Sequence, residues 1–155
     1  MKNLLPLILF AGCTTGSSGT PAVTATAEIA PFGTGTVTGT ATFTEVEGGV
    51  NLAITLSGCV AGKSYPVHIH DGAACTDATT QGGHWAVPRG EGIPNIVCSS
   101  TTGTTTMVRA PSPAESAWTI GGDIATDVEG HVLVVHDPDV PASPPRIGCG
   151  VIAAE

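Results

Sequence analysis

The chain has 155 residues, a formal net charge of -8 at pH 7, 21 glycines and 12 prolines, and only 12% of its residues are charged. This length fits one domain with a proper core. The negative charge argues against nucleic acid or an anionic membrane surface as a partner. Threonine, valine and glycine dominate, and no segment has a sustained apolar repeat at helical period, so the composition favours β structure.

The N-terminus has the pattern of an export signal. Lys2 supplies a positive charge, Leu4 to Phe10 form an apolar run, and Ala11-Gly12-Cys13 ends in small residues and a cysteine. The apolar run is too short to span a bilayer. Small residues before a cysteine resemble the signal of a bacterial lipoprotein. The alternative is an ordinary secretory signal with a leftover thiol.

The lipoprotein interpretation divides the chain into three parts. We expect residues 1–12 to be removed, Cys13 to carry lipid, residues 13–21 to form a flexible tether, and residues 22–155 to form the domain. The protein would then be an exported lipoprotein of the cell envelope that contacts the membrane only through this lipid. In a Gram-negative organism, Thr14 in place of aspartate after the cysteine would favour the outer membrane, with the domain facing the periplasm or the cell surface.

The remaining cysteines predict two disulfides. Setting Cys13 aside leaves an even set in an exported protein, and three pairings of that set are possible: Cys59, Cys75, Cys98 and Cys149. None of them forms the close Cys-x-x-Cys pair of a structural zinc site.

Short strands separated by glycine and proline predict an all-β fold. Alternation is clearest from Thr36 to Glu45, and a turn at Gly48-Gly49 leads into a second alternating run from Val50 to Leu56, which together predict a hairpin. Other strands are expected at Val23–Ile29, around Val67–His70, and at Asn95–Cys98, Thr104–Ala110, Ser116–Ile120, Val132–His136 and Arg146–Ile152. This pattern is typical of an eight-stranded Greek-key sandwich or flattened barrel.

Two histidines on one strand are the strongest functional signal. His68 and His70 are two residues apart and share a face, while Val67 and Ile69 point to the opposite, apolar side. Taken alone, such a pair can be surface decoration.

Two more histidines extend this signal to a set of four. His84 lies in a long irregular stretch from Asp71 to Pro94, and His136 ends an apolar strand. Long loops in compact domains are usually functional or disordered. Four histidines at strand-like positions are a sensible source for an all-nitrogen transition-metal site.

Five segments carry a resemblance to a known family. They are Val67-His68-Ile69-His70, Gly82-Gly83-His84 with Pro88, Gly92 to Ile96, Gly130 to His136, and Arg146-Ile147-Gly148-Cys149-Gly150-Val151-Ile152. In this order they resemble the copper/zinc superoxide dismutases, and they cover most of the chain from about Leu56 onward. The earlier hairpin matches only in pattern.

The resemblance implies roles for individual residues. It makes His68, His70, His84 and His136 the ligands of one copper ion, and Arg146 the cation that guides and holds the superoxide anion. His84 and Arg146 would then be the catalytic residues. The family disulfide would join Cys75 to Cys149, which leaves Cys59 and Cys98 as an added bridge.

The chain also departs from the zinc-containing members. Between His84 and Asn95 there is no histidine, so we expect no zinc, and His84 becomes an ordinary copper ligand. His131 faces the other side of its strand and is expected to be exposed. Only nine residues separate His136 from Arg146, which predicts an open copper site, as in the copper-only members.

Without zinc, the second ring nitrogen of His84 needs another partner. A water or a nearby carboxylate could orient it, and Asp71, Asp123 and Asp137 are candidates by position.

The expected function is copper-dependent dismutation of superoxide to dioxygen and hydrogen peroxide in the cell envelope. The alternative is a copper-binding lipoprotein that buffers the metal without significant turnover, which needs the same histidines but no arginine beside them. A domain that keeps the fold for structure or adhesion is a further alternative. The sequence offers no clear dimer patch, which slightly favours a monomer.

Overall fold

The computed structural model describes residues 22–47, 49–85, 89–109, 117–140 and 145–155. Within these residues the protein is nearly all β, as the composition predicts, with ten strands and one short helix. The strands are β1 (Thr24–Pro31), β2 (Thr38–Val46), β3 (Gly49–Ser57), β4 (Ser64–Tyr65), β5 (Val67–His70), β6 (Ile96–Val97), β7 (Thr102–Arg109), β8 (Val132–His136), β9 (Arg146–Val151) and β10 (Ala153–Ala154), and the helix is α1 (Ala78–Gln81).

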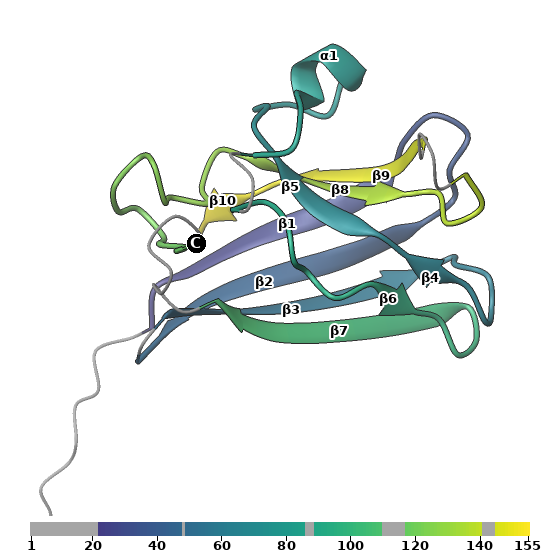
Figure 1. Ribbon diagram of the computed structural model, residues 1–155, viewed down its shortest axis with the longest axis horizontal. Coiled ribbons are helices and arrows are strands. Elements are labelled where there is room, and N and C mark those ends of the chain that lie inside the picture. The colour runs from purple at the N-terminus through teal and green to yellow at the C-terminus, as the bar shows by residue number, and fades with distance from the viewer. Residues whose placement is uncertain (1–21, 48, 86–88, 110–116, 141–144) are drawn as a thin grey trace, which may run out of the picture.

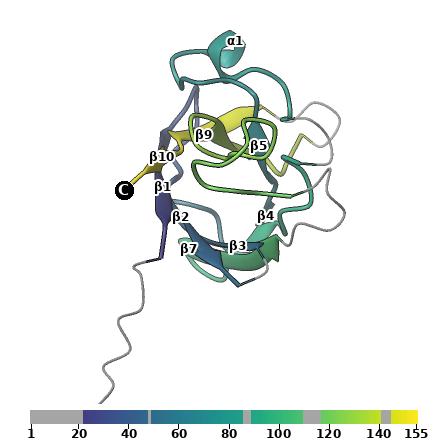
Figure 2. The same cartoon turned by 90° about the vertical axis from the view of Figure 1, so that its left-hand side faces the viewer.

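Eight of these strands form one antiparallel sheet in the order β5-β8-β9-β1-β2-β3-β7, with β10 paired to β1, while β4 and β6 form a small second sheet. The sheet curls into an open, flattened barrel, and α1 lies outside it, above β5 and β9 (Figures 1 and 2). β7 and β8 follow one another in the order of elements but lie near opposite ends of this sheet order. The predicted all-β barrel class is confirmed.

Strand β1 belongs to both halves of the barrel. Thr24 to Ile29 pair with β2, whereas Ala30 and Pro31 pair with Cys149 and Gly148 of β9. This shared strand lets one sheet bend around the core, so that β5, β8 and β9 face β2, β3 and β7.

The main hydrophobic core fills the space between these halves. The predicted hairpin is confirmed: β2 and β3 pair from Thr38 with Ser57 to Val46 with Gly49. Alternate side chains of this hairpin point inward and are fully buried, among them Ala41, Phe43, Leu52, Ile54 and Leu56. Gly48, the first residue of the expected turn, lies outside the described residues.

Most predicted strands agree with the structure to within a few residues, but the strand expected at Ser116–Ile120 is wrong for residues 117–120. Thr119 forms only an isolated parallel bridge with Asp127. The Asp127 carboxylate accepts hydrogen bonds from the backbone N–H groups of Gly121 and Glu129. Such local bonds compete with a sheet ladder, and here they close a loop in its place.

Both implied disulfides are present. Cys59 is bonded to Cys98, and Cys75 is bonded to Cys149 with a Cα–Cα distance of 5.7 Å. The second bond ties the loop after β5 to β9 in the outer face of the barrel. In the described part of the chain, no helix has the length and apolar character needed to cross a membrane. Residues 1–21, including Cys13, lie outside that part, so the signal, the lipid and the tether stay predictions.

The core can be tested away from any functional residue. Replacing Leu52 with alanine should lower the free energy of unfolding by about 2–5 kcal/mol, because it leaves a cavity in the centre of the barrel. Thr55→Ala on the outer face of the same strand should change it by less than about 0.5 kcal/mol. Chemical denaturation measures both values. Equal losses for the two variants would contradict the assignment of the inner face.

Candidate metal centre

The candidate metal centre is built on the outer face of β5 and β8, with its back to the core. Val67 and Ile69 point into the main core, so His68 and His70 project outward, as the period of two predicts. Across the ladder they lie opposite Val134 and Val132, which form a second apolar cluster with Cys149. His136 ends β8 on this same outer face.

His84 reaches the centre from the long loop because its segment pairs with the free edge of β5. His84 and His70 form an antiparallel bridge, and Trp85 donates its backbone N–H to the carbonyl of Ile69. Residues directly opposite one another in a ladder share a face. Three neighbouring segments therefore bring together the four predicted ligands.

One ring nitrogen from each of His68, His70, His84 and His136 lies within 4.8 Å of the other three. The Nε2 atoms of His70 and His136 are 3.2 Å apart. Two nitrogens bonded to one ion at about 2.1 Å cannot be more than about 4.2 Å apart. The cluster is thus within an ångström or so of a spacing that could hold a metal ion. No other such group of histidine, cysteine and carboxylate side chains occurs in the described residues.

The other ring nitrogens already have partners. His70 Nδ1 bonds the carbonyl of Gly82 at 3.1 Å, His84 Nδ1 contacts Glu91 Oε1, and His68 Nε2 lies 3.4 Å from Glu91 Oε2. This leaves the Nε2 atoms of His70 and His84 and the Nδ1 atom of His68 as donors to an ion. His68 Nδ1 is buried and has no hydrogen-bond partner among the described residues. A metal ion would satisfy that nitrogen.

Burial keeps two of these rings neutral. It lowers the pKa of His70 to about 3, although the hydrogen bond to Gly82 opposes this shift. Burial also lowers the pKa of His68, and the neighbouring His84 lowers it further. A neutral imidazole has a lone pair to offer, so both rings suit metal binding at neutral pH.

Glu91 is a candidate site residue that the sequence did not single out. Its carboxylate contacts His84 and His68 with one oxygen each, whereas Asp123 and Asp137 accept backbone N–H groups in their own turns. The carboxylate at His84 is therefore Glu91 and none of the three aspartates considered. One signal was available, because Glu91 is the only carboxylate residue between His84 and Asn95.

Arg146 is brought to the outer face by an irregularity in β9. Val135 pairs with Gly148, but the next residue, His136, pairs with Arg146, so Ile147 is an extra residue on β9. Ile147 packs into the main core. The extra residue shifts the alternation of side chains by one position, so Arg146, on the other side of the bulge from Gly148, faces outward. The side chains of Arg146 and His136 consequently share one face.

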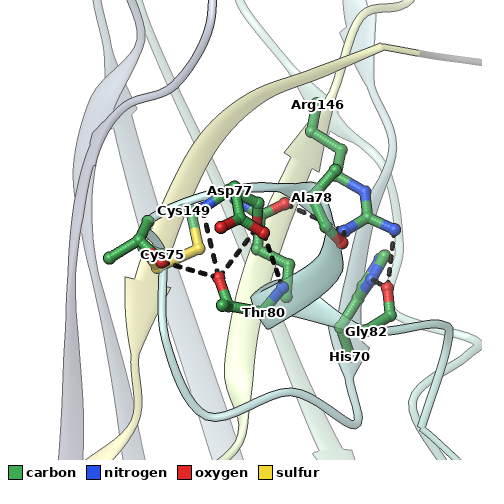
Figure 3. The surroundings of a disulfide bond; sticks show 10 residues. His70, Cys75, Asp77, Ala78, Thr80, Gly82, Arg146 and Cys149 are labelled. Carbon is green, nitrogen blue, oxygen red and sulfur yellow. Dashed lines mark hydrogen bonds between the residues drawn. A yellow bond between two sulfur atoms is a disulfide. The ribbon is translucent and has the colours of Figure 1, made fainter.

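The guanidinium of Arg146 is held by α1 and the residue after it (Figure 3). Its Nη1 donates to the carbonyl of Ala78 at 2.8 Å and to Gln81 Oε1 at 3.0 Å, and its Nη2 donates to the carbonyl of Gly82 at 2.6 Å. Gly82 thus accepts hydrogen bonds from Arg146 and from the candidate ligand His70.

His131 does not join the centre, as expected, but the prediction that it is exposed is wrong. Its ring stacks against Trp85 at a centroid distance of 4.3 Å and is half-buried. Burial lowers its pKa. The period of two gave the correct side of β8, but the Trp85 segment packed beside β5 covers that side.

The centre is open on one side. The side chain of His84 is 36% exposed and that of His68 is 19% exposed, while His70 and His136 are buried. A small anion could therefore approach from the His84 side.

Fold and site together define an all-β domain whose outer face carries a histidine cluster that could hold a metal ion. Comparison of the sequence with protein-family models and with curated proteins finds no match in either. The identity of the metal and the chemistry of the site therefore have to be argued from the residues of this chain.

The fifth histidine provides a matched control for metal binding. His70→Ala should lower the affinity for Cu(II) by at least about tenfold, because one of the four clustered donors is lost. His131→Ala should keep the affinity of the unmodified protein. Competition titration against a chelator measures both. Equal affinities for the two variants would show that the cluster is not the copper site.

Glu91 can be tested in the same way. Glu91→Gln keeps the shape of the side chain but weakens the contact that orients His84 and His68, so copper affinity should fall by about tenfold. Glu129→Gln removes the same charge from an exposed loop position and should have little effect. If the two substitutions weaken copper binding equally, Glu91 contributes only its net charge.

Proposed function

We propose that this chain is a copper-dependent superoxide dismutase that works without zinc. The observation that carries the proposal is the juxtaposition of the histidine cluster with Arg146, which lies directly across the ladder from His136. The motifs that resemble the copper/zinc superoxide dismutases support the same assignment. A copper ion bound there would supply one-electron chemistry, in which one superoxide is oxidised to dioxygen and a second, with two protons, is reduced to hydrogen peroxide.

The donor set fits copper. Neutral imidazoles serve both the Cu(II) and the Cu(I) state, and the cluster contains no thiolate and no carboxylate. His68, His70, His84 and His136 would hold the ion. The orphaned Nδ1 of His68 is the atom whose burial is best explained by a bound ion.

Arg146 would bind the anionic substrate. Its charge persists at every relevant pH, and three hydrogen bonds to α1 and Gly82 fix its position. A fixed cation loses little freedom when an anion arrives, so more of the attraction becomes binding energy. A site that only stored copper would not need this cation.

Glu91 and His84 would hold a proton at the open side. With Nε2 of His84 turned to the cluster, Nδ1 carries the hydrogen and donates it to Glu91 Oε1. This contact fixes the tautomer in which His84 can act as a ligand. The hydrogen on His84 Nδ1 would thus lie on the far side of the same ring whose Nε2 faces the cluster.

We further propose that the protein works outside the cytoplasm, as a lipoprotein anchored through Cys13. The two disulfides support an oxidising compartment. The N-terminal signal pattern supports the lipid anchor, whose attachment mass spectrometry of the purified protein would identify.

Copper-loaded protein should accelerate superoxide decay, and Arg146→Gln should slow that decay by about tenfold or more, because the local positive charge is lost. Lys63→Gln is the matched control, since Lys63 is exposed and is paired with Asp139 rather than with a residue of the histidine cluster. Stopped-flow measurement of superoxide decay, with copper and zinc counted in the same sample, decides the question.

The alternative function predicts a different outcome of that experiment. Tight binding of one copper ion with no faster decay would make the protein a copper-buffering lipoprotein. Equal rates for Arg146→Gln and Lys63→Gln would remove Arg146 from the mechanism.

A further inference from the structure

Gln81 is a fully buried polar residue to which the proposed function assigns no role. It is the last residue of α1, and none of its side chain is exposed. Its Oε1 accepts a hydrogen bond from Arg146 Nη1, whereas its Nε2 has no hydrogen-bond partner among the described residues. Because arginine can only donate, the oxygen of the amide has to face it.

The unpartnered Nε2 group of Gln81 does not favour stability. A buried N–H group without a partner is unfavourable, and an apolar side chain of similar size would avoid that cost. The benefit of Gln81 therefore has to come from its one hydrogen bond, which ends at the cation beside the candidate metal centre.

That hydrogen bond completes the restraint of one end of the guanidinium. Arginine has five N–H donors. The carbonyl of Ala78 and Gln81 Oε1 occupy both hydrogens of Nη1, and the carbonyl of Gly82 takes one of Nη2. The Nε hydrogen and one hydrogen of Nη2 thus have no acceptor among the described residues. Two adjacent donors can bond two atoms of one small anion.

We propose that Gln81 is a positioning residue for Arg146 and thereby sets the affinity of the candidate centre for small anions. The proposal rests on the proposed function for the role of Arg146 itself. Gln81 is buried and does not touch the anion. It acts by holding Nη1, so that the guanidinium cannot rotate and its remaining donors keep one orientation.

The support of Gln81 is rigid. Asp77 caps α1 by accepting the backbone N–H groups of Thr79 and Thr80, and the hydroxyl oxygen of Thr80 accepts the backbone N–H of Asp77. The Cys75–Cys149 disulfide fastens the segment before α1 to β9, which also carries Arg146 (Figure 3). Both ends of the Gln81–Arg146 contact are therefore fixed to one strand.

The first measurement needs no metal. In 15N-labelled, metal-free full-length protein, the Arg146 guanidinium should give separate Nη signals, assigned by their loss in Arg146→Lys. In Gln81→Met these signals should merge through faster rotation, while the protein still unfolds in one cooperative thermal transition. Thr79→Ala changes an exposed side chain of the same helix and should leave the signals separate.

The second measurement uses azide as a small anionic probe of the copper-loaded protein. Gln81→Met should weaken azide binding, followed by its charge-transfer absorption, by about tenfold, with copper affinity unchanged. In the Arg146→Ala background the same substitution should have no further effect, because Gln81 acts only through Arg146.

The possible results separate this inference from the proposed function. Unaltered Arg146 signals in Gln81→Met, or a loss of azide affinity that persists without Arg146, would overturn the role of Gln81. Absence of copper binding or of superoxide decay would overturn the proposed function, and the metal-free measurement would still decide whether Gln81 positions Arg146.

Discussion

The carbonyl oxygen of Gly82 is the acceptor on which the arrangement of the candidate centre depends. It receives hydrogen bonds from His70 Nδ1 and Arg146 Nη2, so one backbone atom fixes both a candidate metal ligand and the neighbouring cation. Gly82 has φ 69° and ψ -165°, a conformation that is essentially restricted to glycine. A Cβ atom there would also lie 1.9 Å from Asp71 Oδ1. The conformation of Gly82 therefore fixes the direction of this carbonyl, and the carbonyl couples the positions of His70 and Arg146.

The centre lies outside the barrel, which separates its requirements from those of the core. Val67, Ile69 and Leu133 pack in the main core, whereas the histidines share the outer face with Val132 and Val134. Histidine side chains can thus be close together without opening a polar hole between the two halves of the sheet. The bulge at Ile147 extends this division to β9: Ile147 stays in the core and Arg146 joins the outer face. With regular pairing in place of the bulge, Ile147 would lie opposite His136 on the outer face and Arg146 would point into the barrel.

Local patterns predicted what depends on local geometry. Alternation gave the β2–β3 hairpin and the common face of His68 and His70, because a strand reverses its side chains at every residue. A continuous apolar run gave the bounds of β8. The bulge, the position of Glu91 and the burial of His131 depend on which segments lie side by side, and periodicity carries no information about that. The strand expected at Ser116–Ile120 is wrong for another reason. The Asp127 carboxylate accepts backbone hydrogen bonds that close a loop at 119–128, in place of the strand pairing that the apolar pattern favoured. The positions of the histidines already grouped His84 and His136 with the pair on β5, whereas the resemblance made all four the ligands of one ion and paired the cysteines.

The formal charge of -8 is compatible with the proposed anionic substrate because salt limits the range of charge interactions. At physiological ionic strength the screening length is about 8 Å, so distant carboxylates contribute little at the open side of the centre. Arg146 lies within that range of an anion at the cluster, since it faces His136 across the ladder. Glu91 is also close, but its oxygens are turned to the rings of His84 and His68 rather than to the approaching anion. The local balance therefore favours attraction even though the whole domain is acidic, and its size is set by how firmly α1 and Gly82 hold the guanidinium.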